Sequence, residues 1–286
     1  MDALLVAASW QALLIAGLLG ASVGSFLNVV IVRLPKQLQL QWKYECAELA
    51  GEPIREKTQF NIAVPGSHCP KCQRTVAWYD NIPILSYLIL RAQCRHCKAP
   101  IPIYYWLVEI ATTAIFIALA WQFGLTLSFW VFGSAVSLLI AMTLIDYQHQ
   151  LLPDNLTYPL LWLALLWSLS PSSAITPSQA IIGAVAGYLS LWSLYWLFKL
   201  LTGKEGMGYG DFKLLAGLSA FTGVTLLPVT VIFSAVAGIV IGLAVAIKHK
   251  QSIPIPFGPF LAIGGVISYL WGETLLQSYW QWLGVM

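Results

Sequence analysis

Charge is the scarcest property of this chain. Only 9% of its 286 residues are Asp, Glu, Lys or Arg, whereas ordinary soluble domains carry about 25%. Hydrophobic residues make up 58% of the sequence, which also contains 13 Trp. This composition excludes an ordinary soluble domain and predicts an all-α polytopic membrane protein.

The sequence also lacks the motifs of several common ligand sites. No G-x-G-x-x-G, P-loop or H-E-x-x-H pattern is present. The sequence therefore does not predict the dinucleotide, nucleotide-phosphate or zinc-protease sites that those patterns mark. We expect no nucleic-acid partner. The first apolar run is preceded by no basic segment and followed by no small-x-small cleavage site. We therefore expect that run to be a retained membrane span and not a removable signal peptide.

Apolar runs indicate about eight membrane spans, each long enough to cross about 30 Å of hydrocarbon. Their approximate bounds are 5–32, 104–123, 128–145, 155–170, 179–198, 211–227, 229–247 and 256–280. The fourth and sixth are the shortest. The only sizeable polar region lies between the first two spans, over about 33–103.

Lys and Arg are missing from one side of this arrangement. No basic residue precedes Arg33, and the connections near 124–127, 171–178 and 228 contain none. Ten of the 15 basic residues lie between Arg33 and Lys98. The others are Lys199, Lys204, Lys213, Lys248 and Lys250. If the chain crosses the membrane eight times, all 15 basic residues lie on the same face of the membrane. The positive-inside rule makes this face cytoplasmic, and both termini then lie on the opposite face.

Two acids stand at the ends of apolar runs. Asp146 follows 129–145, which contains no charge, and Asp211 closes Gly208-Tyr209-Gly210-Asp211 ahead of another apolar run. Ionisable groups at membrane depth are costly, so each is a candidate functional group. The predicted topology puts both at the cytoplasmic face. Two carboxylates that meet in a partly dry site suggest acid/base catalysis on a scissile bond; the alternative is a pair of solvated acids at helix ends.

Four of the five cysteines form two C-x-x-C pairs in the polar loop, Cys69 with Cys72 and Cys94 with Cys97. Each pair can form a tight turn whose thiolates converge on one tetrahedral Zn²⁺. Disulfides are the competing interpretation, but they rarely persist in a reducing cytoplasm. Four thiolates close the metal's coordination shell, so we expect a structural zinc that folds a loop too small to build its own core.

The domain prediction follows from these features. A first transmembrane span over 1–32 precedes a cytoplasmic zinc-binding loop domain over 33–103, and a seven-span catalytic membrane domain covers 104–286. Within the loop, His68 and His96 adjoin the predicted ligands and are expected to be spectators, and Cys46 is expected to be an ordinary thiol.

Several polar and small residues near the predicted face have a structural interpretation. Gly20 and Gly24 are spaced for close helix packing. Asn28 and Arg33 end the first span, where they either serve the site or bind the interface. Glu109, one turn into the second span, is expected to be a snorkelling or paired structural acid.

The loop after the third span and the start of the last span complete this set. Leu152-Pro153-Asp154-Asn155 predicts a turn and a helix start, which Asp154 or Asn155 can cap; capping explains Asp154 without chemistry, although it is a rival for the catalytic role. Pro254, Pro256, Gly258 and Pro259 break the chain before the last span. Irregular backbone at membrane depth needs a cavity or protein around it, so this segment is expected to line the site.

A series of motifs in order along nearly the whole chain resembles those of the type IV prepilin peptidases, the bifunctional leader peptidase/N-methyltransferases of pilus assembly and type II secretion. They are Gly24-Ser25-Phe26-Leu27-Asn28-Val29-Val30 with Arg33-Leu34-Pro35, the two C-x-x-C pairs, Tyr105 through Glu109, Asp146 through Leu151-Leu152-Pro153-Asp154, Gly208-Tyr209-Gly210-Asp211-Phe212-Lys213, and Pro256-Phe257-Gly258-Pro259-Phe260.

The resemblance implies that Asp146 and Asp211 are the catalytic pair of an aspartic G-x-G-D peptidase in the bacterial inner membrane. The implied substrate is a prepilin or pseudopilin with a short basic leader, cut on the cytoplasmic side. Two acids a few ångströms apart cannot both ionise easily, so the pair would share a proton. The family also methylates the new N-terminus with S-adenosylmethionine, but no pattern in the sequence marks the site of that cofactor.

Two other classes of function remain open at this point. One is a proton- or cation-coupled transporter that uses the paired aspartates, although transporters usually show repeated halves with acids near mid-depth. The other is a zinc-folded assembly factor without catalytic activity. Cleavage of a prepilin by the purified protein would separate all three.

Overall fold

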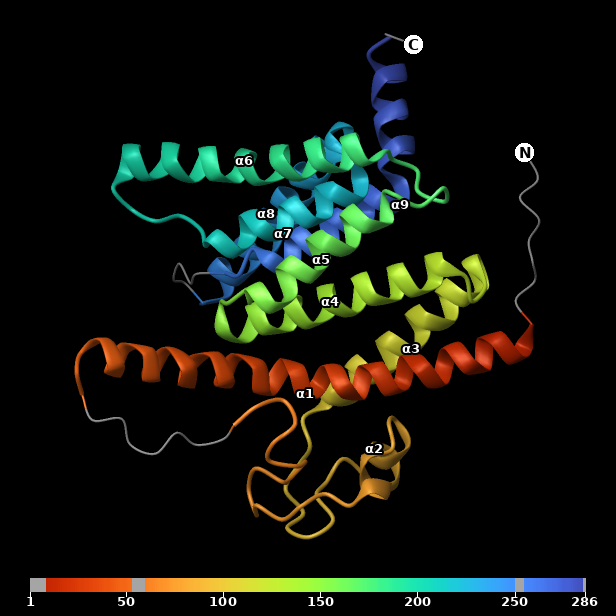
Figure 1. The fold of residues 1–286 in the computed structure, drawn as a ribbon, viewed down its shortest axis with the longest axis vertical. Coiled ribbons are helices and arrows are strands. Elements are labelled where there is room, and N and C mark those ends of the chain that lie inside the picture. The colour runs from red at the N-terminus through yellow and green to blue at the C-terminus, as the bar shows by residue number, and fades with distance from the viewer. Residues whose placement is uncertain (1–8, 53–59, 250–254, 285–286) are drawn as a thin grey trace. The chain divides into compact units, whose positions relative to one another are not determined.

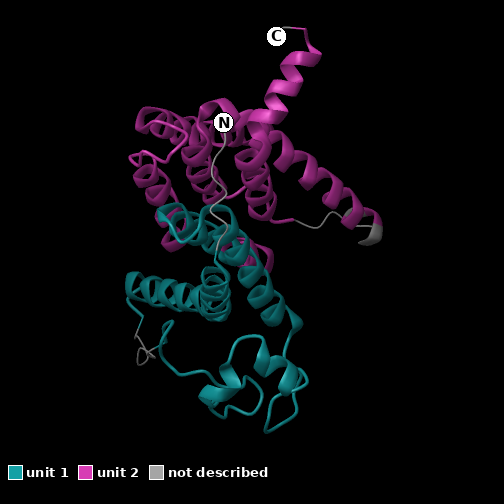
Figure 2. Ribbon diagram, turned by 90° about the vertical axis from the view of Figure 1, so that its right-hand side faces the viewer, with its two compact units in different colours: residues 1–141 teal, residues 142–286 magenta. Residues whose placement is uncertain are grey.

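The computed structural model describes residues 9–52, 60–249 and 255–284. Within these residues the chain is helical, and its only β-structure is two isolated bridge pairs in the polar loop. The chain divides into two compact units, 1–141 and 142–286, which Figure 2 shows in different colours. The boundary between the units falls inside one helix.

Unit 1 is built around two long helices and the polar loop between them. Its elements are α1 (Trp10–Leu49), η1 (Trp78–Asn81), α2 (Leu85–Ile89), α3 (Ile103–Phe123) and the first part of α4 (Leu127–His149). Unit 2 begins with the last turns of α4. Its further elements are α5 (Asp154–Trp167), α6 (Pro177–Thr202), α7 (Tyr209–Thr222), η2 (Val224–Leu226), α8 (Leu227–His249) and α9 (Gly258–Trp282).

The all-α membrane fold is confirmed. Among the described residues, six helices are long and apolar enough to cross a membrane, namely α1, α3, α4, α6, α8 and α9. The fourth and sixth predicted spans are also helices, α5 and α7, but each has only 14 residues. At 1.5 Å per residue such a helix is about 21 Å long, less than the roughly 30 Å of a hydrocarbon core.

Helix α1 runs well beyond the predicted end of the first span at residue 32. It has 40 residues and continues to Leu49, which makes it about 60 Å long. The second half is polar but rich in Gln, Leu, Lys and Glu, which favour helices, and Gln41 Nε2 donates to Glu45 Oε1 at 2.8 Å. The end of the hydrophobic run is therefore not the end of the helix.

Close packing of α1 against α3 holds unit 1 together. A Cβ added at Gly20 would lie 2.8 Å from the Cα of Thr113, and one at Gly24 would lie 2.8 Å from the Cα of Glu109. Only glycine allows the two backbones to approach so closely, and the predicted helix contact is confirmed. Next to this contact, Phe116 of α3 packs edge-on against Phe129 of α4, with ring centroids 5.6 Å apart.

Helix α7 lies at the centre of unit 2, in contact with α5, α6 and α9 (Figure 1). Ten of its 14 residues are buried, including Phe212 and Leu215, which have no exposed surface. The buried positions include seven consecutive residues, 214–220, so they extend around all sides of the helix. Protein therefore surrounds this short helix, which explains why it does not need the length of a complete span.

Candidate active site and metal centre

Asp146 lies in the last turn of α4 and is only 5% exposed. Its Oδ2 accepts a 2.9 Å hydrogen bond from the backbone N–H of Gly258, the first residue of α9. A Cβ added at Gly258 would lie 2.6 Å from that same oxygen. The bond therefore requires a glycine, and the break in the chain before α9 brings a backbone donor to the carboxylate.

Asp211 is the third residue of α7 and is 7% exposed. Its Oδ2 accepts a 3.3 Å hydrogen bond from the backbone N–H of Gly208, so the side chain satisfies a donor at the start of the helix. Gly210 lies against the loop that follows α4, where an added Cβ would be 2.6 Å from the Cβ of Leu152. The G-x-G pattern thus combines a helix start with close backbone contact.

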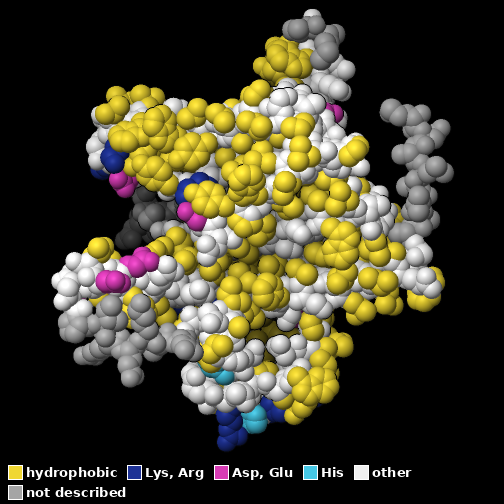
Figure 3. Space-filling view, viewed as in Figure 1, with side chains coloured by type: hydrophobic (Ala, Val, Ile, Leu, Met, Phe, Trp, Pro, Cys, Tyr) yellow, Lys and Arg dark blue, Asp and Glu magenta, His cyan; other side chains and the backbone are white. Residues whose placement is uncertain are grey.

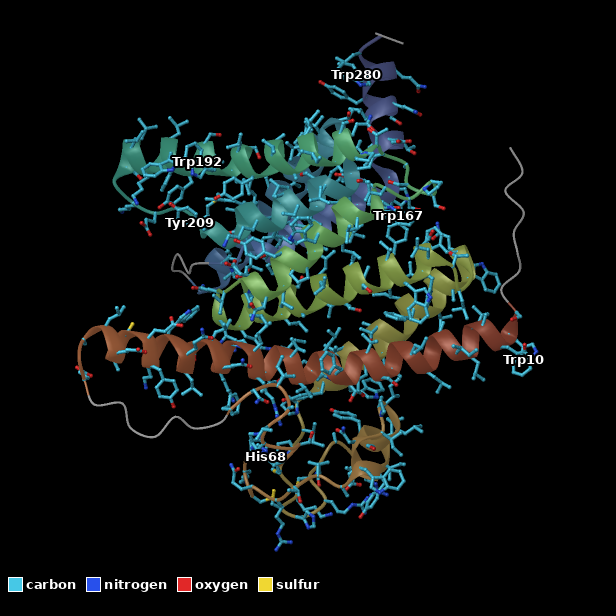
Figure 4. The ribbon with its side chains drawn as sticks, in the orientation of Figure 1. Trp10, His68, Trp167, Trp192, Tyr209 and Trp280 are labelled. Atoms are coloured by element: carbon cyan, nitrogen blue, oxygen red, sulfur yellow. The ribbon has the colours of Figure 1, made fainter. Side chains whose placement is uncertain are left out.

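Both acids line one cavity of about 400 Å³ in unit 2. Its walls come from three segments that are distant in sequence: Gln150–Leu152, Gly206–Gly210 and Ile255–Phe257. The predicted lining by the proline-rich segment is confirmed for the last of these, while Pro254 lies outside the described residues. Tyr209, labelled in Figure 4, packs against Tyr195 of α6 with ring centroids 5.4 Å apart.

Asp154 does not cap α5, and that prediction is wrong. It is the first helical residue, and the N-cap position is Pro153, which makes no side-chain cap. Its Oδ1 instead lies 2.6 Å from the Nζ of Lys213, and that ammonium also lies 5.1 Å from the centre of the Tyr158 ring. Lys213 is 59 residues away from Asp154 in sequence, so the local sequence around Asp154 indicated only a helix cap. Asp154 is not among the residues that line the cavity.

A second ion pair fixes the segment that forms one wall of the cavity. Lys199, in the last turn of α6, lies 2.9 Å from Glu205 Oε1 and 3.2 Å from the hydroxyl of Tyr195. The hydrogen bond from Lys199 holds the pKa of Glu205 below its usual range. Glu205 immediately precedes the lining residue Gly206. No sequence pattern marks this role, because an acid six residues after a lysine is common in loops.

The four predicted zinc ligands converge in the loop of unit 1. The sulfur atoms of Cys69, Cys72, Cys94 and Cys97 all lie within 4.8 Å of one another. The two C-x-x-C turns share one backbone pattern: Gln73 N donates to Cys69 O at 2.9 Å, and Lys98 N donates to Cys94 O at 3.1 Å. Gln73 and Lys98 both have φ of 58°, so the two turns present their sulfurs in the same way.

Backbone donors lower the pKa of two of these thiols, Cys69 and Cys94. N–H groups of Cys72 and Lys71 lower the pKa of Cys69 to about 6, and those of Cys97 and His96 lower the pKa of Cys94. The N–H of Ala99 lowers the pKa of Cys97, but burial and the neighbouring sulfurs outweigh it and raise that pKa to about 11. Four soft sulfur donors within 4.8 Å of one another fit Zn²⁺, whose charge would favour the thiolate form of each.

The predicted spectators do not join this cluster. The Nδ1 of His68 lies 2.9 Å from Gly66 O, and that of His96 lies 3.2 Å from a guanidinium nitrogen of Arg74. Cys46 is an exposed residue of α1. The group of possible metal ligands in the described residues consists of the four cysteines alone.

Asn28 joins the two long helices of unit 1, and Arg33 and Glu109 attach the loop to them. Asn28 Nδ2 donates to Tyr105 O at 2.9 Å, and Arg33 donates to three loop carbonyls, those of Ile62, Pro65 and Gly66. Glu109 Oε2 accepts a 2.7 Å hydrogen bond from the backbone N–H of Ile84. Glu109 is thus hydrogen-bonded to the loop backbone.

The comparison with known proteins covers both halves of the chain. Residues 18–123 match the bacterial peptidase A24 N-terminal domain, and residues 133–243 match the type IV leader peptidase family. A prepilin leader peptidase/N-methyltransferase of Pseudomonas aeruginosa is 48% identical over 273 residues, 93% of each chain. The proteins of the same name from Pseudomonas putida and Aeromonas hydrophila are 44% and 45% identical, over 94% of each chain. No solved structure matches the chain.

Proposed function

The chain belongs to the type IV leader peptidase family, and we propose that it is a membrane aspartic endopeptidase that removes the short leader of type IV prepilins or type II secretion pseudopilins. We further propose that it then methylates the new N-terminal residue. The family membership supports this function and not that of a proton- or cation-coupled transporter.

One observation carries the peptidase proposal: Asp146 and Asp211, from the end of one helix and the start of another, line the same cavity. In the proposed mechanism, the ionised carboxylate takes a proton from a water molecule. The protonated partner donates a hydrogen bond to the scissile carbonyl, so the hydroxide forms a tetrahedral intermediate. The intermediate collapses when the leaving nitrogen receives a proton, which returns the pair to its starting state with one proton shared.

The location of the acids suits a substrate cut at the membrane boundary. We propose that the protein lies in the bacterial inner membrane with residues 33–103 and the active site on the cytoplasmic side, because all its Lys and Arg fall on one face of the predicted topology. Labelling of introduced cysteines from outside should succeed at Thr126 and Ser172 and fail at Lys204. The reverse pattern would place the acids in the wrong compartment for a basic leader.

Methyl transfer is proposed with S-adenosylmethionine as the methyl donor, following the resemblance and the names of the relatives. Hydrolysis needs paired acids, whereas methyl transfer needs a neutral amine in line with the sulfonium methyl group. The two activities should therefore be separable. Asp146→Asn and Asp211→Asn, given an already cleaved pilin and labelled S-adenosylmethionine, should still label it. No label from either variant, with wild type active, would indicate a shared site.

The decisive test of the peptidase is cleavage of a purified prepilin by the purified protein in detergent, followed by mass spectrometry. The expected products are the free leader and a mature pilin that begins with its apolar helix, and a second mass, 14 Da higher, appears when S-adenosylmethionine is added. An intact prepilin after incubation with zinc-loaded, folded protein would rule out the proposed activity and favour a non-catalytic assembly factor.

A further inference from the structure

The short helix α2 of the polar loop lies beside a membrane-spanning helix and not beyond its end. The backbone N–H of Ile84, just before α2, donates to Glu109 of α3 at 2.7 Å. Tyr87 of α2 stacks on Trp106 of α3 with ring centroids 5.7 Å apart and planes 20° from parallel. Glu109 is the seventh residue of α3, about 9 Å along the helix axis from its first residue. Both contacts place α2 at the depth of the first two turns of α3.

The face of α2 that points away from α3 is apolar and uncovered. Leu85, Leu88 and Ile89 are spaced so that they share one side of the helix, and they are 56%, 55% and 73% exposed. Trp78 of the adjoining η1 is 81% exposed. Figure 3 shows hydrophobic side chains gathered over the part of the loop where α2 lies. Exposing these four apolar side chains to water would be unfavourable, and clustered apolar surface of this kind marks a site of contact with lipid or protein.

We propose that this α2 surface, made of Leu85, Leu88 and Ile89, inserts into the lipid interface next to α3. The position of α2 beside α3 favours lipid, and not a protein partner, as the molecule that covers this surface. Ile103 and Leu107, in the first two turns of α3, are 59% and 51% exposed on a helix long enough to span the membrane. The lipid that covers those residues continues sideways onto α2, because the two elements lie at one depth.

The charges around the α2 surface complement an anionic membrane. Residues 60–102 contain five Lys or Arg and a single acid, Asp80. That acid is taken by Arg95, whose Nε lies 2.7 Å from its Oδ2. Arg91 is exposed and follows α2 by two residues, so its guanidinium can reach lipid phosphates while the leucines lie deeper. Trp and Tyr favour the same zone, and Trp78 and Tyr79 adjoin α2.

The insertion gives the loop a second point of attachment. Zinc and the contacts of Glu109 and Arg33 fix its internal shape and its connection to α1 and α3. Contact of α2 with lipid would additionally set the height of the whole loop against the bilayer. The proposal does not depend on peptidase or methyltransferase activity, so failure of either function would leave it standing.

The test places the photocrosslinking residue p-benzoylphenylalanine at Leu88 in the full-length, zinc-loaded protein. The matched control carries it at Lys71, an exposed residue of the first C-x-x-C turn. Both are reconstituted in nanodiscs of phosphatidylethanolamine and phosphatidylglycerol without pilin, irradiated and analysed by mass spectrometry. We expect lipid adducts at position 88 in several-fold excess over position 71. Equal yields would overturn the proposal, as would a pilin adduct that replaces the lipid adduct once pilin is added.

Two further experiments control for an altered fold and test the contribution of the positive charge of Arg91. If the variant at Leu88 loses its zinc, the probe is moved to Ile89, and the same excess is expected. Arg91→Glu in the chain with the probe at Leu88 should lower the lipid-adduct yield in discs that contain phosphatidylglycerol but not in discs of phosphatidylcholine alone. An unchanged yield in both would overturn the role of the anionic headgroup.

Discussion

The backbone N–H of Gly258 donates a 2.9 Å hydrogen bond to the carboxylate of Asp146, across 112 residues of sequence. This bond joins the end of α4 to the start of α9. It also explains the irregular segment that precedes α9, because a regular helix would have used that N–H for its own backbone bond. The proline-rich break therefore serves to bring a donor to a buried acid.

Replacing either acid by its amide should abolish prepilin cleavage. Asn is nearly isosteric with Asp but cannot take up and return a proton, so Asp146→Asn and Asp211→Asn should each lose almost all turnover while the protein stays folded. The measurement is cleavage by purified variants with matched amounts and melting temperatures. Glu273→Gln is the control, because Glu273 is an exposed acid of α9 that lies outside the cavity lining. Substantial cleavage by folded Asp146→Asn would remove that residue from the mechanism.

Gly258→Ala should impair cleavage far more than it impairs folding. The new methyl group would lie 2.6 Å from Asp146 Oδ2, so either the carboxylate or the start of α9 must move. The matched control is Gly242→Ala in α8, where the nearest neighbour, Ile255 Cδ1, lies 3.7 Å away and an added Cβ makes ordinary contact. We expect at least a tenfold loss of kcat/KM for the first variant, about 1.4 kcal/mol in transition-state binding, and little change for the second. Equal activities would mean that Asp146 tolerates displacement.

Reversing the charge of either Lys213 or Asp154 should lower prepilin cleavage, and exchanging the two charges should restore it. Lys213 lies two residues after Asp211, and its ion pair joins the second turn of α7 to the first turn of α5. The side chains are 24% and 50% exposed, so solvent screens the pair and its contribution to stability is at most about 1 kcal/mol. We expect Lys213→Asp and Asp154→Lys to lower cleavage and the double variant to recover it. Three equally impaired variants would show that the pair is not the relevant contact.

Zinc removal should loosen the loop without touching the acids. We expect one zinc per chain by elemental analysis, and its loss when Cys69 and Cys72, or Cys94 and Cys97, are replaced by Ser. The loop should then become sensitive to proteases. Because the cysteines and the two acids belong to different units, some cleavage of prepilin should survive. Freshly purified protein without metal would contradict the assignment.

The ion pair of Glu205 with Lys199 should make the adjoining cavity wall sensitive to acid. The folded-state pKa of Glu205 is depressed, so the pair stabilises the segment fully above the unfolded value of about 4.3 and is lost as pH falls through the folded value. Hydrogen exchange of a peptide covering 203–209 should be faster in Glu205→Gln than in wild type at pH 7. The difference should shrink as pH falls below about 4.3, after correction for intrinsic exchange rates. A difference that is independent of pH would exclude the carboxylate's charge as the cause.

Sequence patterns predicted what depends on local composition and spacing. The apolar runs predicted eight helices, seven of them close to their observed bounds, and two C-x-x-C pairs predicted the convergence of four sulfurs that the structure contains. Contacts between distant residues escaped this reasoning. The prediction that Asp154 caps α5 was wrong because its partner, Lys213, is 59 residues away in sequence. The predicted end of the first span fell short of the end of α1, because hydropathy indicates contact with lipid and not helix formation. The donor from Gly258 depends on how α4 and α9 meet, which no local pattern encodes.

The short, enclosed helix α7 has a consequence for membranes of different thickness. Bilayers that are thicker or thinner than a helix force that helix to tilt or the lipid to deform. Helix α7 is surrounded by α5, α6 and α9, so we expect the helices that are long enough to span the membrane to absorb such a mismatch in its place. Asp211 at its start is held by protein neighbours, independently of the local lipid. Cleavage should accordingly vary little with the acyl-chain length of the lipid in which the protein is reconstituted.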